Sequence, residues 1–348
     1  MSGDVAIVGL GMITAVGLTA GATAASVRSA TMRFSETSLM DRQLEPFILA
    51  EVVEDALPAI SDRITPGELT GRGARLLRLG TVALTECLKA MPPRRPRPGL
   101  VLSLPETSTT LALDARQFLA RFAKQTEDAF DITRSDASHQ GRSGGLAALG
   151  QAAETIRAGR AELMIAGGID TYRDLYVLGT LDLEQRVKSS VNLDGFIPGE
   201  GAAFLLLSRA GAAIAPLAMV SQVAQAFENG HLYSPEPYRG DGLASAVQQL
   251  VNSGSVEGPI QEVYSSMNGE HHWAKEWGTA FIRNSGAFLP GHGTHHPADC
   301  FGDTGAACGP LMAGLAALGI KQGYRRSPAL VYGSSDRGQR AAVLVHAA

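Results

Sequence analysis

The feature that most constrains this chain is an alternation of short apolar runs with helix-like stretches. Residues 5–12 form a continuous apolar run, which is typical of a strand buried on both faces. A helical pattern follows over 67–91, and further apolar runs cover 97–104 and 199–210. Alternation of this kind predicts parallel sheets whose faces are covered by helices.

The same order returns after Pro216, so the sequence predicts an internal duplication. The 348 residues suffice for two units, and we expect the two halves to be 1–215 and 216–348. In the first half, a short strand is expected at 129–133 and a helix at 111–125. In the second half, strands are expected at 217–227, 261–267, 328–335 and 341–347, and helices at 242–254, 273–282 and 304–323.

The stretch 136–170 holds a polar loop, a small-residue helix and an apolar strand that is expected to end at the Gly167–Gly168 turn. The helix is rich in Ala and Gly, like the helix after Thr304, and we expect the two to pack closely between sheets. A helix start of this kind often holds a nucleophile. Here that position carries Arg142.

Composition excludes several classes of function. Hydrophobic residues make up 45% and charged residues 18%, as in a globular protein with a large core. A net charge of −4 argues against nucleic acid and anionic membrane surfaces as partners. Three cysteines form no disulfide framework, and the N-terminus has no basic segment before its apolar run. We therefore expect a cytoplasmic protein that does not enter the membrane.

Four motifs resemble those of the β-ketoacyl synthases. They are VAIVGLGMITAVG (5–17), RSGGLAALGQAAETIRAGRAELMIAGG (142–168), NLDGFIPGEGAAFLLL (192–207) and GDTGAACG (302–309). They occur in the family's order and at compatible spacings. The resemblance implies an α/β, thiolase-like fold with two pseudo-duplicated halves in a five-layered α-β-α-β-α sandwich.

The family's activity needs a cysteine and two histidines, and the resemblance implies that this chain lacks all three. The cysteine position is Arg142, the first histidine position is Asn268 and the second is Asp303. The family's glycine-rich gating loop is replaced by GSSDRGQRA (333–341). An arginine side chain stays protonated and cannot accept an acyl group. The resemblance therefore implies a protein that is not a working condensing enzyme of this type.

The substituted positions suggest a structural contact of their own. A cation at a helix start opposes the helix dipole by ~0.3–1 kcal/mol, so Arg142 should have a compensating anion. Asp303 stands at the start of the partner helix, and the family positions face each other. We predict an ion pair between Arg142 and Asp303. The alternatives are that Asp303 is only a helix cap and that Arg142 points into solvent.

Other polar residues are candidates for a residual pocket. Ser143 and His139 suggest a nucleophile–base pair, although Ser143 also suits a helix cap. Glu270 and His271, with His272 beside them, suggest acid–base function or a polar helix start. Glu200 matches a family position that supports the site structurally, whereas Trp273 and Trp277 are expected to pack on the core or on a partner.

Two further stretches could each be either an ordinary loop or a functional site. His292, His295, His296, Asp299 and Cys300 are crowded into GHGTHHPADC, but the spacing matches no standard metal module and favours a loop near the site. MPPRRPRPG (91–99) is a solvated connector or a contact for a polyanion. We predict no metal and no cofactor.

These observations lead to three function hypotheses. The first is a catalytically inactive ketosynthase-like protein that acts through protein interaction, as an accessory or adaptor for a bacterial type VI secretion effector. The second is a subunit like a chain length factor, which partners an active β-ketoacyl synthase in fatty-acid or polyketide synthesis. The third is an acyltransferase-type enzyme with non-standard site chemistry. The expected partners are a second thiolase-fold chain, as homodimer or heterodimer, and a secretion effector or an acyl carrier protein.

Overall fold

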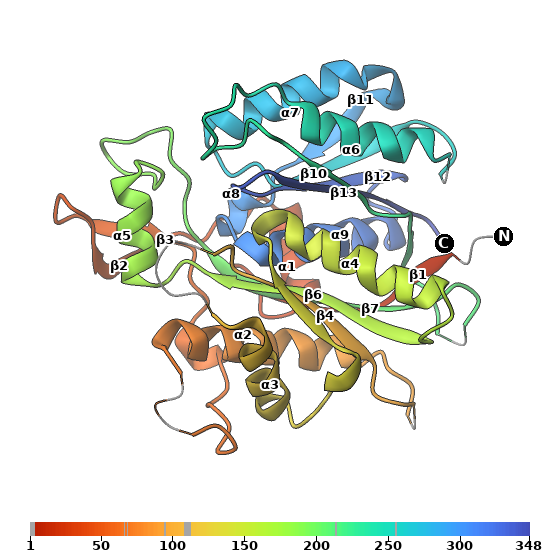
Figure 1. Cartoon of the computed structure of the whole chain (residues 1–348), viewed down its shortest axis with the longest axis horizontal. Coiled ribbons are helices and arrows are strands. Elements are labelled where there is room, and N and C mark those ends of the chain that lie inside the picture. Colours follow the sequence, from red (N-terminus) through yellow and green to blue (C-terminus); the bar gives the residue numbers. More distant parts are fainter. Residues whose placement is uncertain are drawn as a thin grey trace.

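The computed structural model describes residues 4–65, 67, 69–93, 95–107, 113–212, 214–254 and 256–348, and these form a five-layered sandwich (Figure 1). Helices α6 and α7 cover one sheet, α2 and α3 cover another, and α4 and α9 lie between the two sheets (Figure 1). The bounds of these helices are α2 (Gly71–Leu88), α3 (Ala115–Gln125), α4 (Gly141–Arg157), α6 (Asp241–Asn252), α7 (His271–Arg283) and α9 (Cys308–Lys321).

The first sheet has the order β5-β4-β6-β7-β1, and β7 runs opposite to its neighbours. Its strands are β1 (Val5–Thr14), β4 (Gly99–Leu104), β5 (Asp136–His139), β6 (Leu163–Thr171) and β7 (Glu200–Arg209). β1, β4 and β6 are buried along their whole length, as expected for strands with helices on both faces.

The second sheet has the order β11-β10-β12-β13, with β8 and β9 both paired to β13. Its strands are β8 (Ala218–Val220), β9 (Ala224–Phe227), β10 (Ile260–Ser265), β11 (Phe288–His295), β12 (Ala329–Ser334) and β13 (Gln339–His346). If the strands of each half are numbered in chain order, with β8 and β9 counted together as the first strand of the second half, both sheets have the order third, second, fourth, fifth, first. The repeated order confirms two similar halves, and β8 joins them by also pairing with β1. The exact boundary at 215/216 stays a prediction.

Small residues allow the middle layer to be thin, as the sequence predicts. α4 and α9 contact each other where a Cβ atom on Gly145 would lie only 2.2 Å from Cδ of Pro310. A larger residue at Gly145 would force the helices apart, because protein interiors are close-packed. The contact holds the start of α4 next to the loop that leads into α9.

The sequence predicts a turn at Gly167–Gly168, and this prediction is wrong. The pair lies inside β6, which continues to Thr171. A Cβ atom on Gly168 would lie 2.0 Å from the carbonyl oxygen of Ala306, in the 3₁₀ turn η4 (Gly305–Ala307). Gly168 therefore permits close packing of this turn on the strand rather than a chain reversal.

Three other expected elements differ from the structure. Residues 129–133 are not a strand; they lead into the 3₁₀ turn η2 (Ile132–Arg134), and the strand begins at Asp136. The expected strand at 217–227 is split into β8 and β9, because the Ser221 hydroxyl accepts a hydrogen bond from the amide of Leu344 between them. The expected loop at 291–300 instead contributes β11, which pairs with β10, and the short helix α8 (Ala298–Phe301).

The expected helix at 111–125 begins at Ala115, and residues 111 and 112 lie outside the described residues. Additional elements form an arm beside the sandwich in Figure 1. They are the hairpin β2 (Ser35–Met40) and β3 (Pro46–Leu49) and the helix α5 (Leu175–Leu183), while α1 (Ala20–Arg28) lies on the middle layer. In the described part of the chain, no helix combines the length and apolar character needed to cross a bilayer.

Candidate functional site

Arg142 is the second residue of α4, and only 2% of it is exposed. Gly141 opens the helix with φ +58°, a conformation that glycine adopts without strain. The neighbouring amide of Ser143 donates to the hydroxyl of Ser335, 2.9 Å away. The helix start therefore faces the C-terminal end of β12 in the second half, since Ser335 directly follows that strand.

The guanidinium group of Arg142 is surrounded by acceptors from the second half. Nη1 donates to Asp303 Oδ2 at 2.6 Å, Nε donates to the carbonyl of Ser334 at 2.9 Å, and Nη2 donates to Asp336. Burial alone would lower the pKa of Arg142, but the carboxylates of Asp336 and Asp303 raise it well above its ordinary value. The predicted ion pair with Asp303 is present, and Arg142 does not point into solvent.

Asp303 combines the two roles that the sequence left as alternatives. Its Oδ1 accepts a hydrogen bond from the amide of Gly305 at 2.8 Å, which caps the turn before α9. Its Oδ2 accepts from Arg142 and from Asn268 Nδ2 at 2.8 Å. The structure therefore brings Arg142 and Asn268 together on the carboxylate of Asp303.

The network continues through Asp336, Arg186 and Glu270 and closes on Asn268. Arg186 donates to Asp336 at 2.7 Å and to both oxygens of Glu270 at 2.8 and 2.9 Å. Asn268 Nδ2 donates to Glu270 at 3.0 Å. Burial would raise the pKa values of Asp336 and Glu270, but the two arginines hold the pKa of Asp336 below its ordinary range, and Arg186 lowers that of Glu270.

An aromatic side chain completes this closed group. The Trp273 indole Nε1 donates to Glu270 at 2.9 Å, and the ring lies 4.5 Å from the Arg142 guanidinium carbon. Guanidinium groups pack favourably over aromatic faces. Two cations and three carboxylates thus meet in a site that is mostly closed to water. We call Arg142, Asn268, Asp303, Asp336, Arg186, Glu270 and Trp273 the site network.

Glu106 borders the site network from the end of β4. Its carboxyl group accepts backbone hydrogen bonds from Asp336 at 3.1 Å and from Arg337 at 3.0 Å. Burial and the neighbouring charge of Asp336 raise the pKa of Glu106 to about 7. This carboxyl group is therefore poised to change its charge near neutral pH.

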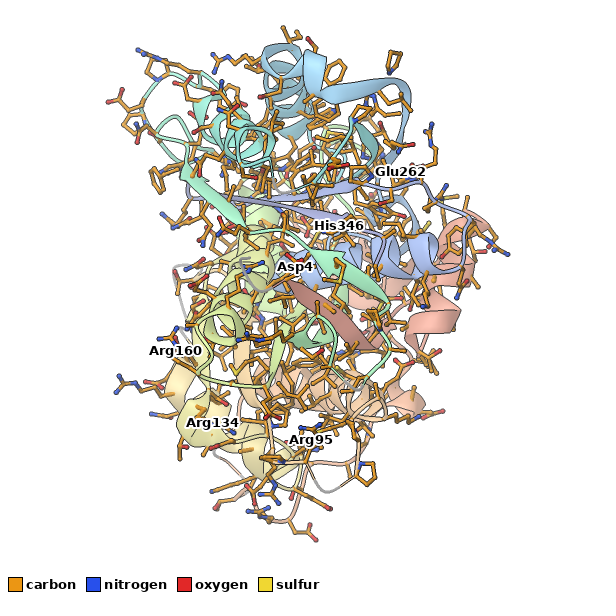
Figure 2. The ribbon with its side chains drawn as sticks, turned by 90° about the vertical axis from the view of Figure 1, so that its right-hand side faces the viewer. Asp4, Arg95, Arg134, Arg160, Glu262 and His346 are labelled. Carbon is orange, nitrogen blue, oxygen red and sulfur yellow. The ribbon has the colours of Figure 1, made fainter. Side chains whose placement is uncertain are left out.

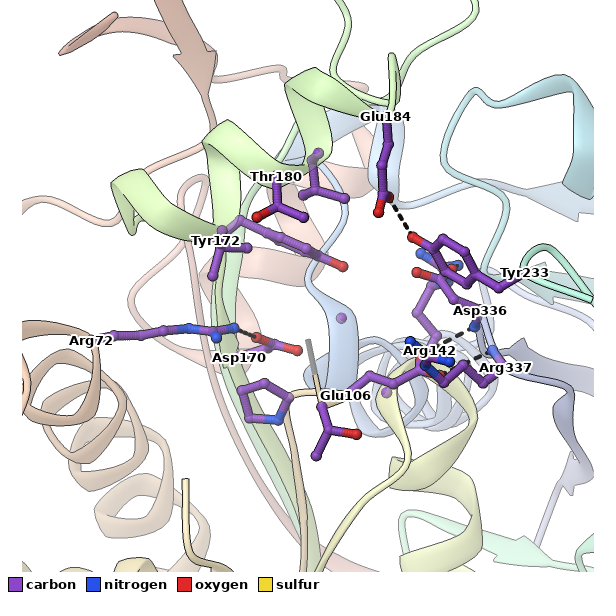
Figure 3. Close-up of a pocket in the computed structure, with 16 residues that line it drawn as sticks. Arg72, Glu106, Arg142, Asp170, Tyr172, Thr180, Glu184, Tyr233, Asp336 and Arg337 are labelled. Atoms are coloured by element: carbon purple, nitrogen blue, oxygen red, sulfur yellow. Dashed lines mark hydrogen bonds and ion pairs between the residues drawn. The ribbon is translucent and has the colours of Figure 1, made fainter. Parts of the chain in front are cut away.

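A cavity of about 90 Å³ lies against this network. Figure 3 shows Arg142 and Glu106 lining it, with Tyr172 and Tyr233 on opposite sides. Arg72 pairs with Asp170 at 3.3 Å, and the Tyr233 hydroxyl donates to Glu184 at 2.6 Å. Pockets for small molecules usually measure about 300–1,000 Å³, so this cavity has room for a few waters.

The other candidate residues, Ser143, His139, His271 and His272, do not contact one another in a catalytic arrangement. The Ser143 hydroxyl lies 2.8 Å from the Ser335 hydroxyl, whereas His139 Nδ1 lies 2.8 Å from the Pro105 carbonyl. The two residues therefore make separate contacts and not the suggested pair. The backbone amide of His271 donates to Asp194 at 2.7 Å. His272 packs edge-on against Trp273, and burial lowers its pKa.

Glu200 is buried in a separate network of the first half. It accepts hydrogen bonds from Arg75 at 2.5 and 2.6 Å and from the Thr171 hydroxyl at 2.7 Å. The amide of Val52 donates to it at 2.8 Å. These contacts tie β7, β6 and α2 together, which fits an architectural role.

The histidine-rich segment engages partners other than a metal. His295 Nε2 lies 2.8 Å from Glu262, and His296 Nδ1 lies 2.5 Å from the Ser265 hydroxyl. His292 Nδ1 lies 3.2 Å from the carbonyl of Leu289 in its own strand. Within the residues that the structure describes, no group of three His, Cys, Asp or Glu side chains is placed to hold a metal ion.

Sequence reasoning missed three residues of the site, Asp336, Arg186 and Glu106. It also missed the contact of Trp273 with Arg142. Asp336 and Glu106 did carry a signal, because each lies two residues after an apolar strand, at the sheet edge where α/β proteins build their sites. Arg186 lies in an irregular segment after α5, and no periodicity pointed to its position.

Comparison with solved structures places the chain in the thiolase-fold class. The ishigamide ketosynthase/chain length factor matches at a TM-score of 0.75, with 15% identity and all of both chains covered. The complex AntDE:AntF, a type II polyketide synthase acyl-carrier protein with its ketosynthase, matches at 0.76, with 15% identity and full coverage of both chains. The ketosynthase from module 6 of the bacillaene synthase of Bacillus subtilis 168 matches at 0.80, with 12% identity over 99% of this chain and 72% of that one.

One segment of the chain is also similar in sequence to the ketosynthases. Residues 141–213, which begin with α4 and run past the end of β7, match the family model of the β-ketoacyl synthase N-terminal domain. No curated protein sequence matches the chain. The resemblance seen in the sequence motifs and the fold it implies are thereby confirmed.

Proposed function

We propose that this chain is a non-catalytic ketosynthase-like subunit that pairs with an active ketosynthase, in the manner of a chain length factor. The observation that carries the proposal is Arg142, which is buried and ion-paired at the start of α4. The resemblance places the family's nucleophile there, and α4 lies within the segment that matches the family model.

The chemistry of the three substituted positions supports an inactive site. The guanidinium of Arg142 remains protonated, and its pKa is raised further by two carboxylates, so it offers no electron pair to a thioester. Asn268 has no proton to exchange near neutral pH, and Asp303 is occupied by Arg142 and Gly305. The cavity of about 90 Å³ also leaves little room for an acyl chain.

The similar structures support the kind of partner. One is a ketosynthase/chain length factor, and another is a ketosynthase in complex with an acyl-carrier protein. We accordingly propose a second thiolase-fold chain as the main partner and an acyl carrier protein as a further one. The accessory role beside a type VI secretion effector, and the cytoplasmic location, stay predictions from the sequence.

Co-expression tests the proposal. The tagged chain, produced with a type II ketosynthase encoded near its gene, should co-purify as a heterodimer by size exclusion with light scattering. The heterodimer should take up label from an acyl thioester on the ketosynthase subunit only, as seen by intact-protein mass spectrometry.

Two results would overturn the proposal. Acylation or thioester turnover by this chain alone, lost in Arg142→Ala or Asp303→Ala, would establish the acyltransferase-type alternative. Exclusive co-purification with a secretion effector, with the ketosynthase left unbound, would favour the accessory role instead.

A further inference from the structure

A second surface, at the opposite end of the first sheet, carries a concentration of arginines. It is a groove of about 600 Å³ to which the loop before β4, the turn η2 before β5, the turn between α4 and β6, and the end of β7 all contribute. These segments share one edge because β7 runs opposite to its neighbours. Figure 2 labels Arg95, Arg134 and Arg160 along this flank of the molecule.

The groove is basic although the chain as a whole is acidic. Its arginines are Arg95, Arg97, Arg134, Arg160 and Arg209, and Glu162 is the acidic residue that lines it with them. The net charge of the whole chain is −4, so this surface has the opposite sign of charge to the chain as a whole. Arginine is also the side chain best suited to paired recognition of carboxylates and phosphates.

Three of these arginines are without an anionic partner among the described residues, and one of the three is held by a backbone carbonyl instead. Arg95 pairs with Glu162 at 2.5 Å, and Arg134 pairs with Asp131 at 2.7 Å. Arg209 donates to the carbonyl of Ile156 at 3.1 Å, near the end of α4. Among the described residues, neither Arg97 nor Arg160 has an ion-pair partner, and both side chains are exposed.

The spacing of the arginines and the apolar lining between them indicate which kind of anionic ligand fits the groove. Its arginines are spread along an open groove, and two of them are already held by carboxylates, so they do not form one compact cradle for a phosphate. Between the arginines the lining is apolar, with Pro96, Ala161 and Leu163. An extended ligand with both carboxylates and apolar side chains matches this lining better than a nucleic acid, whose backbone is uniformly charged.

We propose that this groove binds an acidic, partly apolar segment of a partner protein. The groove lies at the edge of the sheet away from Arg142, so a partner bound there leaves the site network free. The proposal does not depend on pairing with a ketosynthase, and it gives the arginine-rich segment 91–99 a function beyond that of a connector.

A binding assay on the full chain tests this surface. The probe is a fluorescein-labelled peptide with repeated Glu-Glu-Leu units, followed by fluorescence anisotropy at low salt. We expect saturable binding that weakens as salt is added and that weakens about tenfold or more in the double variant Arg97→Glu/Arg160→Glu. The matched control, Arg116→Glu/Arg239→Glu, changes the net charge equally at exposed arginines outside the groove and should bind like the wild type.

Several outcomes would overturn the proposal. One is the lack of saturable binding at low salt by protein whose thermal melt is normal. Another is equal weakening in the control double variant, which would show only general electrostatic attraction. A third is tighter binding of pyrophosphate or a single-stranded oligonucleotide than of the peptide. The variant Arg97→Ala/Arg160→Ala, which introduces no new charge, should weaken peptide binding in the same direction.

Discussion

The two ends of helix α4 present arginines in opposite circumstances. At its N-terminal end, Arg142 is 2% exposed and held by carboxylates from the other half of the molecule. Beyond its C-terminal end, Arg160 is exposed and has no ion-pair partner among the described residues. The helix dipole favours a cation at the second position and opposes it at the first, by ~0.3–1 kcal/mol.

The difference shows that burial, more than the helix dipole, decides what an arginine needs. A buried guanidinium loses several kcal/mol of hydration and must regain it from partners, which Asp303, Asp336 and the Ser334 carbonyl provide. An exposed guanidinium keeps its water and remains available for a ligand. The following predictions test this contrast, beginning with the largest expected effect.

Arg142→Ala should lower the free energy of unfolding by about 3–5 kcal/mol, because it removes the arginine partner of the buried Asp303 and leaves the half-buried Asp336 with Arg186 alone. Urea unfolding followed by tryptophan fluorescence measures the change, and Trp273 lies close enough to report on the site. A loss below ~1 kcal/mol would show that the ion pairs do not hold the two halves together.

Asp303→Asn should have a smaller effect, a loss of about 2 kcal/mol. The substitution keeps the side-chain volume and an acceptor for the amide of Gly305, and Arg142 retains Asp336 as a partner. In a double-mutant cycle, Arg142→Ala and Asp303→Asn should deviate from additivity by about 0.5–3 kcal/mol. Strict additivity would contradict direct coupling of the two side chains.

Glu106 should make stability depend on pH between its ordinary pKa of 4.5 and its folded pKa of about 7. The folded state binds this proton more tightly than the unfolded state, so the contribution of Glu106 to stability falls as pH rises through this window. Asp336 does not interfere, since its lowered pKa affects stability only in more acidic solution.

The variant Glu106→Gln isolates this effect, because its side chain stays neutral. The free energy of unfolding of the variant minus that of the wild type should increase by on the order of 1 kcal/mol or more from pH ~5 to pH ~8. Urea unfolding at a series of pH values measures it. A difference that stays constant with pH would contradict the raised pKa.

Arg160→Ala should change the free energy of unfolding by less than about 0.5 kcal/mol, as surface substitutions without buried contacts usually do. The same urea experiment measures it and serves as the control for Arg142→Ala at the other end of the helix. A loss comparable to that of Arg142→Ala would show that Arg160 is a structural residue, and the contrast between the two ends would fail.

Much of the fold could be predicted because it depends on local patterns. The continuous apolar runs of β1, β4 and β7 and the small-residue helices α4 and α9 are explicit in the sequence, and so is their repeated order. Predictions failed where non-local contacts decide the local structure. Gly168 resembles a turn residue, but it lies within a strand, and a glycine is needed there because the carbonyl of Ala306 approaches it closely.

The candidate site shows the same division. The resemblance pointed to Arg142, Asn268 and Asp303, and the sequence supported an ion pair between the first and the last. It gave no indication that Asp336 bridges Arg142 to Arg186, because the three residues lie far apart in the chain and two of them, Asp336 and Arg186, are in irregular segments. Only the packing of the two halves brings them within hydrogen-bonding distance.

The sequence by itself thus determined the layered α/β architecture, its duplication and the presence of an arginine where a nucleophile is expected. Those properties follow from periodicity and side-chain chemistry, which are local. The tertiary structure alone decided that this arginine is fully neutralised by two carboxylates, while the arginines beyond the other end of α4 remain exposed along a groove. The physical reason is that burial and charge pairing depend on which segments meet in space.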